Sequence, residues 1–135
     1  MNKTASKEWL RIAYHDLKSA QILFEADHYT DSIGNDLQQS LEKILKSILA
    51  FQNAKIPKTH DLFELYDLAN NFFTVSNDEI EFFEIATEYF KEDRYPNPNY
   101  CLPSKEEIEK VLYFTEQILE DVCKILNINI QDIKN

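Results

Sequence analysis

Residues 31–51 of the chain read DSIGNDLQQSLEKILKSILAF, and this stretch decides the class of fold. Its large apolar residues recur at steps of three and four positions, the spacing of one face of an α-helix. They are Ile33, Leu37, Leu41, Ile44, Leu45 and Ile48. Gly34 stands in the first part of this helix, where Gly costs about 1 kcal/mol relative to Ala. We therefore expect a neighbouring helix to approach the backbone closely at Gly34.

The same apolar spacing predicts four more helices. One spans about residues 6–27, and another begins where Thr59 or Asp61 caps it. A fourth helix follows SNDE at 76–79, and a fifth follows SKEE at 104–107 and reaches about residue 126. Both tetrapeptides fit a capping box, in which a Ser and a Glu side chain satisfy each other's backbone amides. The tail NINIQDIKN, 127–135, alternates only weakly, so we expect a frayed end.

Five helices with short connections and no strand pattern predict an all-α protein. We expect an up-and-down bundle of about five helices in one domain over residues 1–126. Eight residues on the apolar stripes should be largely buried: Trp9, Leu17, Leu41, Leu45, Leu65, Phe83, Leu112 and Leu119.

The composition limits the classes of function. The net charge is −10, and residues 61–135 carry 17 acidic against six basic residues. Such a surface does not coat nucleic acid non-specifically, because phosphate binding needs positive charge. No apolar run approaches the ~20 residues that span a bilayer, and the N-terminus has no apolar signal-peptide core. We expect a cytoplasmic protein that does not bind membranes, with Cys101 and Cys123 as free thiols.

Motifs for catalysis, cofactors and metals are weak. A single Gly excludes the Gly-rich phosphate loops and the nucleophile elbow. Glu25 and His28 have the Glu-x-x-His spacing of di-iron bundles, but such sites need two of these pairs and two further Glu residues. We therefore expect no metal, no cofactor and no assignable catalytic residue.

Two loops carry the candidate binding residues. KIPKTHDL, 55–62, places Lys58 and His60 near a helix start, where amides and the helix dipole favour an anion. A helix cap with a hydrogen-bonded His explains the same residues.

RYPNPNY, 94–100, holds one of only two Arg residues of the chain, Arg94. The Arg94 guanidinium can fork onto a phosphate, and Tyr95 and Tyr100 can stack on a base. A stiff loop whose Arg pairs with nearby carboxylates is the alternative.

Four segments together resemble the HEPN family (higher eukaryotes and prokaryotes nucleotide-binding domain). They are WLRIAYHDLKSAQILFEADHYTDSI, DLQQSLEKILKSIL, KIPKTHDLFEL and RYPNPN, and they follow the family's order over nearly the whole chain. The resemblance implies a helical bundle that commonly forms homodimers. Sixteen Phe and Tyr residues in 135 agree with a homodimer. The family resemblance also implies a small stand-alone protein that partners a minimal nucleotidyltransferase in a toxin–antitoxin-like system.

Many HEPN proteins are metal-independent RNases, and their signature is an Arg followed, after four to six residues, by a His. Here the positions that follow Arg94 at that spacing are Asn99, Tyr100 and Cys101. Asn99 can hydrogen-bond a phosphate, but it cannot act as a general base. The sequence thus favours a binding and interaction subunit that takes a nucleotide or RNA at Arg94, Tyr95, Asn99, Tyr100, Lys58 and His60. The alternative is a HEPN ribonuclease with an irregular active site.

Overall fold

The structure, a computed structural model, describes residues 1–90 and 101–134. Within these ranges the chain forms six helices and no strand, which confirms the all-α class. They are α1 (Lys3–Glu25), α2 (Thr30–Phe51), α3 (Leu62–Ala69), α4 (Asn77–Thr87), α5 (Lys105–Ile125) and α6 (Ile130–Ile133). None of these helices is both long and apolar enough to cross a bilayer.

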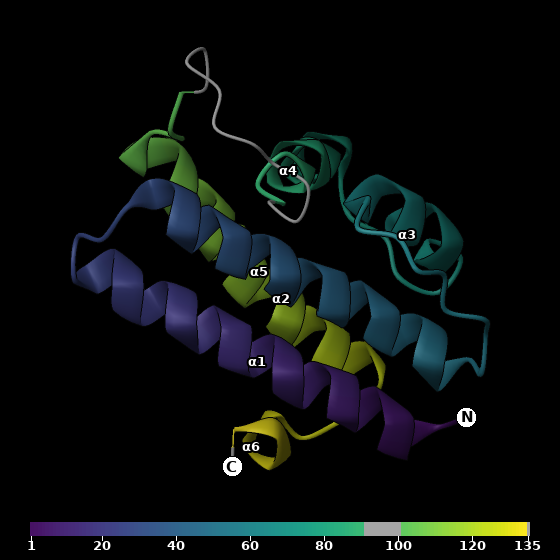
Figure 1. Ribbon diagram of the computed structural model, residues 1–135. Helices are drawn as coiled ribbons and strands as arrows, with labels where there is room; N and C mark the ends of the chain where they lie inside the picture. The colour runs from purple at the N-terminus through teal and green to yellow at the C-terminus, as the bar shows by residue number, and fades with distance from the viewer. Residues whose placement is uncertain (91–100, 135) are drawn as a thin grey trace.

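Helix α2 lies at the centre of the bundle. It runs antiparallel beside α1, with α5 behind the pair and α3 and α4 to one side (Figure 1). Because α2 contacts α1, α3, α4 and α5, 15 of its 22 residues are buried. The stretch that predicts the fold class is therefore also the segment around which the other helices pack.

The expected core is confirmed at seven of eight positions. Leu17, Leu41, Leu45, Leu65, Phe83, Leu112 and Leu119 are all buried. Trp9 is the exception, because it is only partly buried. The Lys46 ammonium lies 5.7 Å from the centroid of the Trp9 ring, so this ring covers a charged side chain instead of filling the core.

Helix starts follow the predicted capping chemistry with one difference. Ser76 and Glu79 form the full capping box, and Asp61 caps α3 by accepting from two backbone amides. Ser104 accepts from the amide of Glu107, which is half of the second box. The Glu107 carboxylate instead accepts from the hydroxyl of Tyr89, a buried residue that follows α4 and packs on Gly34.

The C-terminal tail differs from the expected frayed end. Residues 130–133 form α6, and Asn129 caps it by accepting from the Gln131 amide. Ile128 and Ile133 are buried, and α6 packs against α1. Ile128 and Ile133 thus anchor the tail to the bundle. The sequence pattern alone does not predict this, because the anchoring depends on packing against other helices.

Gly34 does mark a close approach, although a side chain and not a helix backbone makes it. A Cβ added at Gly34 would lie 2.9 Å from Cγ of Tyr89, a distance that real Cβ contacts essentially never reach. Tyr89 itself is buried and follows the end of α4. The absence of a side chain at residue 34 thus lets the region after α4 pack directly on α2.

We predict that Gly34→Ala destabilises the protein, although Ala favours helix by about 1 kcal/mol. The added methyl overlaps the buried Tyr89 ring, and such overpacking costs about 1–3 kcal/mol. Urea denaturation of the wild type, Gly34→Ala, Tyr89→Ala and the double variant measures the effect. In the Tyr89→Ala background the same substitution should become neutral or stabilising. Destabilisation that is equal in both backgrounds would contradict the assigned contact.

Candidate ligand-binding site around His60

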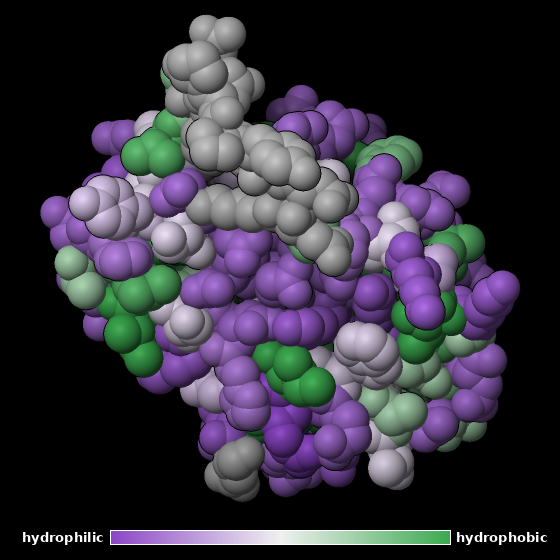
Figure 2. Space-filling model, viewed as in Figure 1, coloured by the Kyte–Doolittle hydropathy of each residue, from purple (hydrophilic) through white to green (hydrophobic). Residues whose placement is uncertain are grey.

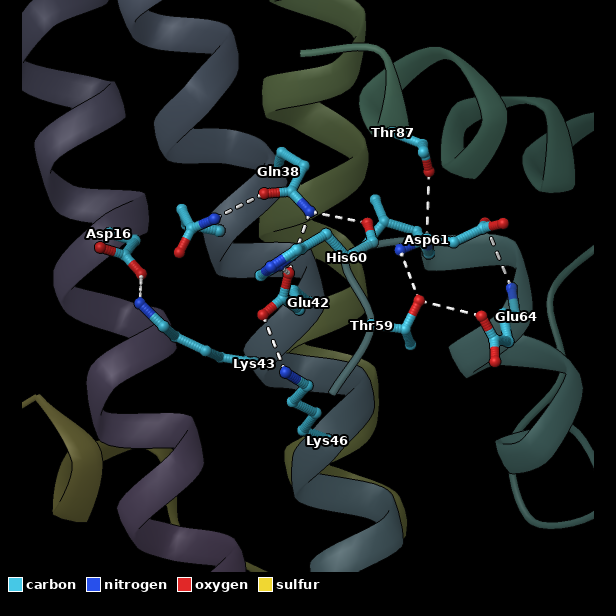
Figure 3. Close-up of polar contacts among 12 residues, drawn as sticks. Asp16, Gln38, Glu42, Lys43, Lys46, Thr59, His60, Asp61, Glu64 and Thr87 are labelled. Atoms are coloured by element: carbon cyan, nitrogen blue, oxygen red, sulfur yellow. Dashed lines mark hydrogen bonds and ion pairs between the residues drawn. The ribbon is translucent and has the colours of Figure 1, made fainter. Parts of the chain in front are cut away.

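Three polar residues form a buried stripe on helix α2. Gln38, Glu42 and Lys46 are spaced four residues apart, so they lie on one face of the helix. All three are buried. The stripe points toward the segment that precedes α3, where His60 lies against it (Figure 3). Burial of charged groups demands partners, and the contacts of the stripe supply them.

The Glu42 carboxylate accepts hydrogen bonds from three side chains. Its Oε1 lies 2.9 Å from Nδ1 of His60 and 3.1 Å from Nε2 of Gln38. Its Oε2 lies 2.9 Å from Nζ of Lys46. Gln38 Nε2 also donates to the backbone carbonyl of His60 at 3.0 Å. The network therefore fixes both the backbone and the side chain of His60 on α2.

These contacts decide the ionisation of Glu42. Burial alone would raise the pKa of this carboxyl group, since water no longer stabilises its charge. The hydrogen bonds from Lys46, His60 and Gln38 outweigh burial, so the pKa lies below its ordinary value. Glu42 is therefore an anion at neutral pH, and an ionised carboxylate can only accept hydrogen bonds.

The ionised Glu42 determines the orientation of His60. Because Glu42 can only accept, Nδ1 of His60 must carry the proton, and in the neutral ring Nε2 carries the lone pair. The imidazole stacks on the Phe90 ring with centroids 3.8 Å apart and planes 17° from parallel. Its side chain remains 44% exposed. His60 is thus a held, half-exposed imidazole on the surface of the bundle.

The surrounding surface is polar with balanced charge. The face formed by α1 and α2 is mainly hydrophilic (Figure 2). Lys43 pairs with Asp16 of α1 in the same way that Lys46 pairs with Glu42. Asp36 is half-buried on α2, and this desolvation raises its pKa, with a smaller contribution from the negative charge of Asp16. Both α2 lysines are therefore already paired with carboxylates of the chain.

The structure places two of the predicted binding residues in one segment. His60 lies in the Glu42 network, and Lys58 is exposed two residues earlier. The first amides of α3 bond to Asp61. Four further candidates lie outside the described residues: Arg94, Tyr95, Asn99 and Tyr100.

Sequence reasoning missed the role of Glu42, Gln38 and Phe90. A signal for the first two was present, because Gln, Glu and Lys follow one another at intervals of four residues in a helix whose buried residues are mainly apolar. A stripe of this kind predicts a buried polar contact with a neighbouring segment. No local pattern signals the Phe90 stack, since it joins residues 30 positions apart.

We predict that Glu42→Gln lowers the free energy of unfolding by about 2 kcal/mol at neutral pH, because a buried Lys46 ammonium loses its anion. Because the pKa of Glu42 is lower in the folded than in the unfolded protein, ionised Glu42 stabilises the fold at pH values above the unfolded-state pKa. This stabilisation is lost as the pH falls through the folded-state pKa of Glu42. The difference between wild type and variant should therefore shrink below about pH 4.5. Urea denaturation at several pH values measures it.

The exposed Glu25→Gln is the matched control and should change stability by less than about 0.5 kcal/mol at any pH. An effect of Glu42→Gln that equals this control would show that the network contributes nothing.

Comparisons with known proteins place this geometry in a family. The family model of the HEPN domain matches residues 6–126. The fold is similar to the crystal structure of TT1696 from Thermus thermophilus, with a TM-score of 0.75 and 24% identity. It is also similar to ST0689, an archaeal HEPN homologue, with a TM-score of 0.69 and 19% identity. Each likeness covers 93% of this chain and 99% of the other. No curated protein matches the sequence. Because the family model spans nearly the whole bundle, the chain belongs to the HEPN domain family.

Proposed function

We propose that this HEPN protein is a binding and interaction subunit that takes a phosphate-bearing ligand, a nucleotide or an RNA, beside His60. Lys58 belongs to the same site, and Arg94, Tyr95, Asn99 and Tyr100 complete it. The observation that carries the proposal is the stack of His60 on Phe90. Phe90 is the last described residue before the segment 91–100, and Arg94 follows it by four positions.

The held imidazole supports a binding role. Glu42 and Gln38 fix His60 before any ligand arrives, so little rotamer freedom is lost on binding. Because Nδ1–H is bonded to Glu42, the ring donates to a phosphate oxygen through Nε2–H, which is present when the imidazole is protonated. Exposed lysines at 55 and 58 add positive charge in the same segment. The α2 lysines contribute less, because Asp16 and Glu42 neutralise them.

Energetics require several groups to act together. One forked Arg–phosphate contact contributes roughly 1.5–3 kcal/mol. A millimolar dissociation constant already corresponds to about 4 kcal/mol. Arg94 alone is therefore insufficient, and the proposal requires His60 and Lys58, or groups from a second subunit, at the same ligand.

The proposed partner is a minimal nucleotidyltransferase, with the pair acting as a toxin–antitoxin-like system. Family membership supports this assignment, because small stand-alone HEPN proteins are often encoded beside a minimal nucleotidyltransferase. The missing His after Arg94 supports a subunit that binds without cleaving.

A metal-independent ribonuclease is the second candidate. The specific observation in its favour is the Glu42–His60 pair, since a carboxylate that orients an imidazole is a common arrangement for proton transfer. Against it, none of Asn99, Tyr100 and Cys101 supplies the His of the family's nuclease signature.

We predict that ATP or a short single-stranded RNA binds the wild type, and that Arg94→Ala and His60→Ala each weaken binding about tenfold. That factor corresponds to one lost charge-assisted hydrogen bond. Isothermal titration measures the affinities, and circular dichroism checks each fold. His15→Ala is the matched control, because His15 is an exposed His on α1 and its removal should leave the affinity unchanged.

Two outcomes would contradict this binding site. In one, the wild type binds neither ligand. In the other, both alanine variants bind as well as the wild type. An RNA-degradation assay in EDTA separates the second candidate: cleavage by the wild type that is lost in His60→Ala would make the protein a nuclease.

We also predict a homodimer. Family membership and the aromatic content of the chain support it. Light scattering at micromolar concentration should give a mass near twice that of one chain. A monomer mass under these conditions would remove the dimer from the proposal, while the titrations would still test the ligand site.

A further inference from the structure

An apolar groove lies between α4 and α5, and none of its lining residues belongs to the described part of the His60 site. Its volume is about 540 Å³. Phe82 and Phe114 form its floor, with stacked rings whose centroids lie 4.9 Å apart. Phe114 is also held edge-on by the core residue Phe83 at 5.4 Å. The floor is thus built into the core and keeps its shape without an occupant.

One wall of the groove is an unusually exposed aromatic residue. Tyr113 lines the groove and is 63% exposed. Lining residues on α5 extend from Glu109 to Gln117, which at 1.5 Å per residue is about 12 Å along the helix axis. This length accommodates about two turns of a partner helix, which would place side chains at i, i+3 or i+4, and i+7 in the groove.

The charge around the groove selects the occupant. Glu79 and Glu109 lie at its rim, with Lys110 as the one basic residue of the lining. The helices that form it are acidic as well: α4 carries four acidic residues and no basic residue, and α5 carries six acidic and three basic residues. A second copy of the chain would meet this face with the same acidic surface. Like charges across an interface are costly, so the charge disfavours self-association here.

We propose that the α4–α5 groove binds a basic amphipathic helix of a partner protein. The apolar face of that helix fills the space above Phe82 and Phe114, and its Lys or Arg side chains pair with Glu79 and Glu109. Aromatic anchors surrounded by a charged rim are the usual anatomy of a helix-binding groove. No described residue of the phosphate site lines this groove, so each proposal can fail without the other.

The probe is a synthetic helix of about 14 residues with Leu on one face and Lys on its flanks. Two control peptides replace Lys by Glu, or Leu by Ser. Backbone amide spectra of the full-length protein report the binding position and affinity. The basic peptide should shift resonances around Phe82 and Tyr113, and both control peptides should bind at least about tenfold more weakly.

Variants of the protein assign the contacts. Tyr113→Ser should weaken peptide binding about tenfold without loss of fold, since the side chain is mostly exposed. Glu109→Lys should weaken it about fivefold. Glu25→Lys is the matched control, because Glu25 is an exposed carboxylate on α1, which does not line the groove, and it should have little effect. His60→Ala should bind the peptide normally, which separates this surface from the phosphate site.

Four results would overturn the proposal. They are the absence of shifts at millimolar peptide, shifts that map to another surface, equal binding of the acidic peptide, and a halved mass of Tyr113→Ser in light scattering. The last result would show that a second copy of the chain occupies the groove.

Discussion

A buried carboxylate on the central helix determines how the candidate site is built. An ionised group inside a bundle costs several kcal/mol unless hydrogen bonds replace its water. Glu42 obtains those bonds from Lys46, Gln38 and His60. Two of these donors belong to α2 itself, but His60 comes from the segment before α3. The requirement to satisfy one charge therefore ties a surface segment to the centre of the fold.

That tie extends along the chain. The His60 imidazole stacks on the Phe90 ring. Tyr89, the residue before Phe90, packs on Gly34 of α2. The Tyr89 hydroxyl then reaches Glu107 at the start of α5. The residues that follow α4 are thereby linked to both α2 and the start of α5. The two surfaces with proposed functions differ in character: one is a polar site around a held imidazole, and the other is an aromatic groove with an acidic rim.

The helices were predictable from the sequence because apolar spacing and capping chemistry are local. The spacing of Leu37, Leu41 and Ile44 requires a helix wherever the partner lies, and Ser76 with Glu79 marks a helix start on its own. The differences occur where a distant partner competes for a group. Glu107 bonds Tyr89 instead of closing its capping box, and Ile133 anchors a tail that looks frayed in isolation.

The candidate site was predictable only in part for the same reason. His60 and Lys58 are predictable candidates, because a His and a Lys near a helix start suit an anion. Glu42, whose carboxylate orients His60, lies 18 positions earlier in the chain. Burial of Glu42 becomes apparent only when α2 is surrounded by other helices. A buried polar stripe beside the apolar one shows that a partner exists, but the identity of that partner depends on the fold.

The most direct measurement of the Glu42–His60 interaction is the imidazole nitrogen spectrum of ¹⁵N-labelled protein at a pH where the ring is neutral. The three His signals are assigned by comparison with His60→Gln and His15→Gln. If Glu42 holds the ring, His60 should show the tautomer protonated at Nδ1, and Glu42→Gln should shift its signal toward the mixture seen for exposed His residues. A His60 ring protonated mainly at Nε2, or a spectrum that Glu42→Gln leaves unchanged, would contradict the central role of the buried carboxylate.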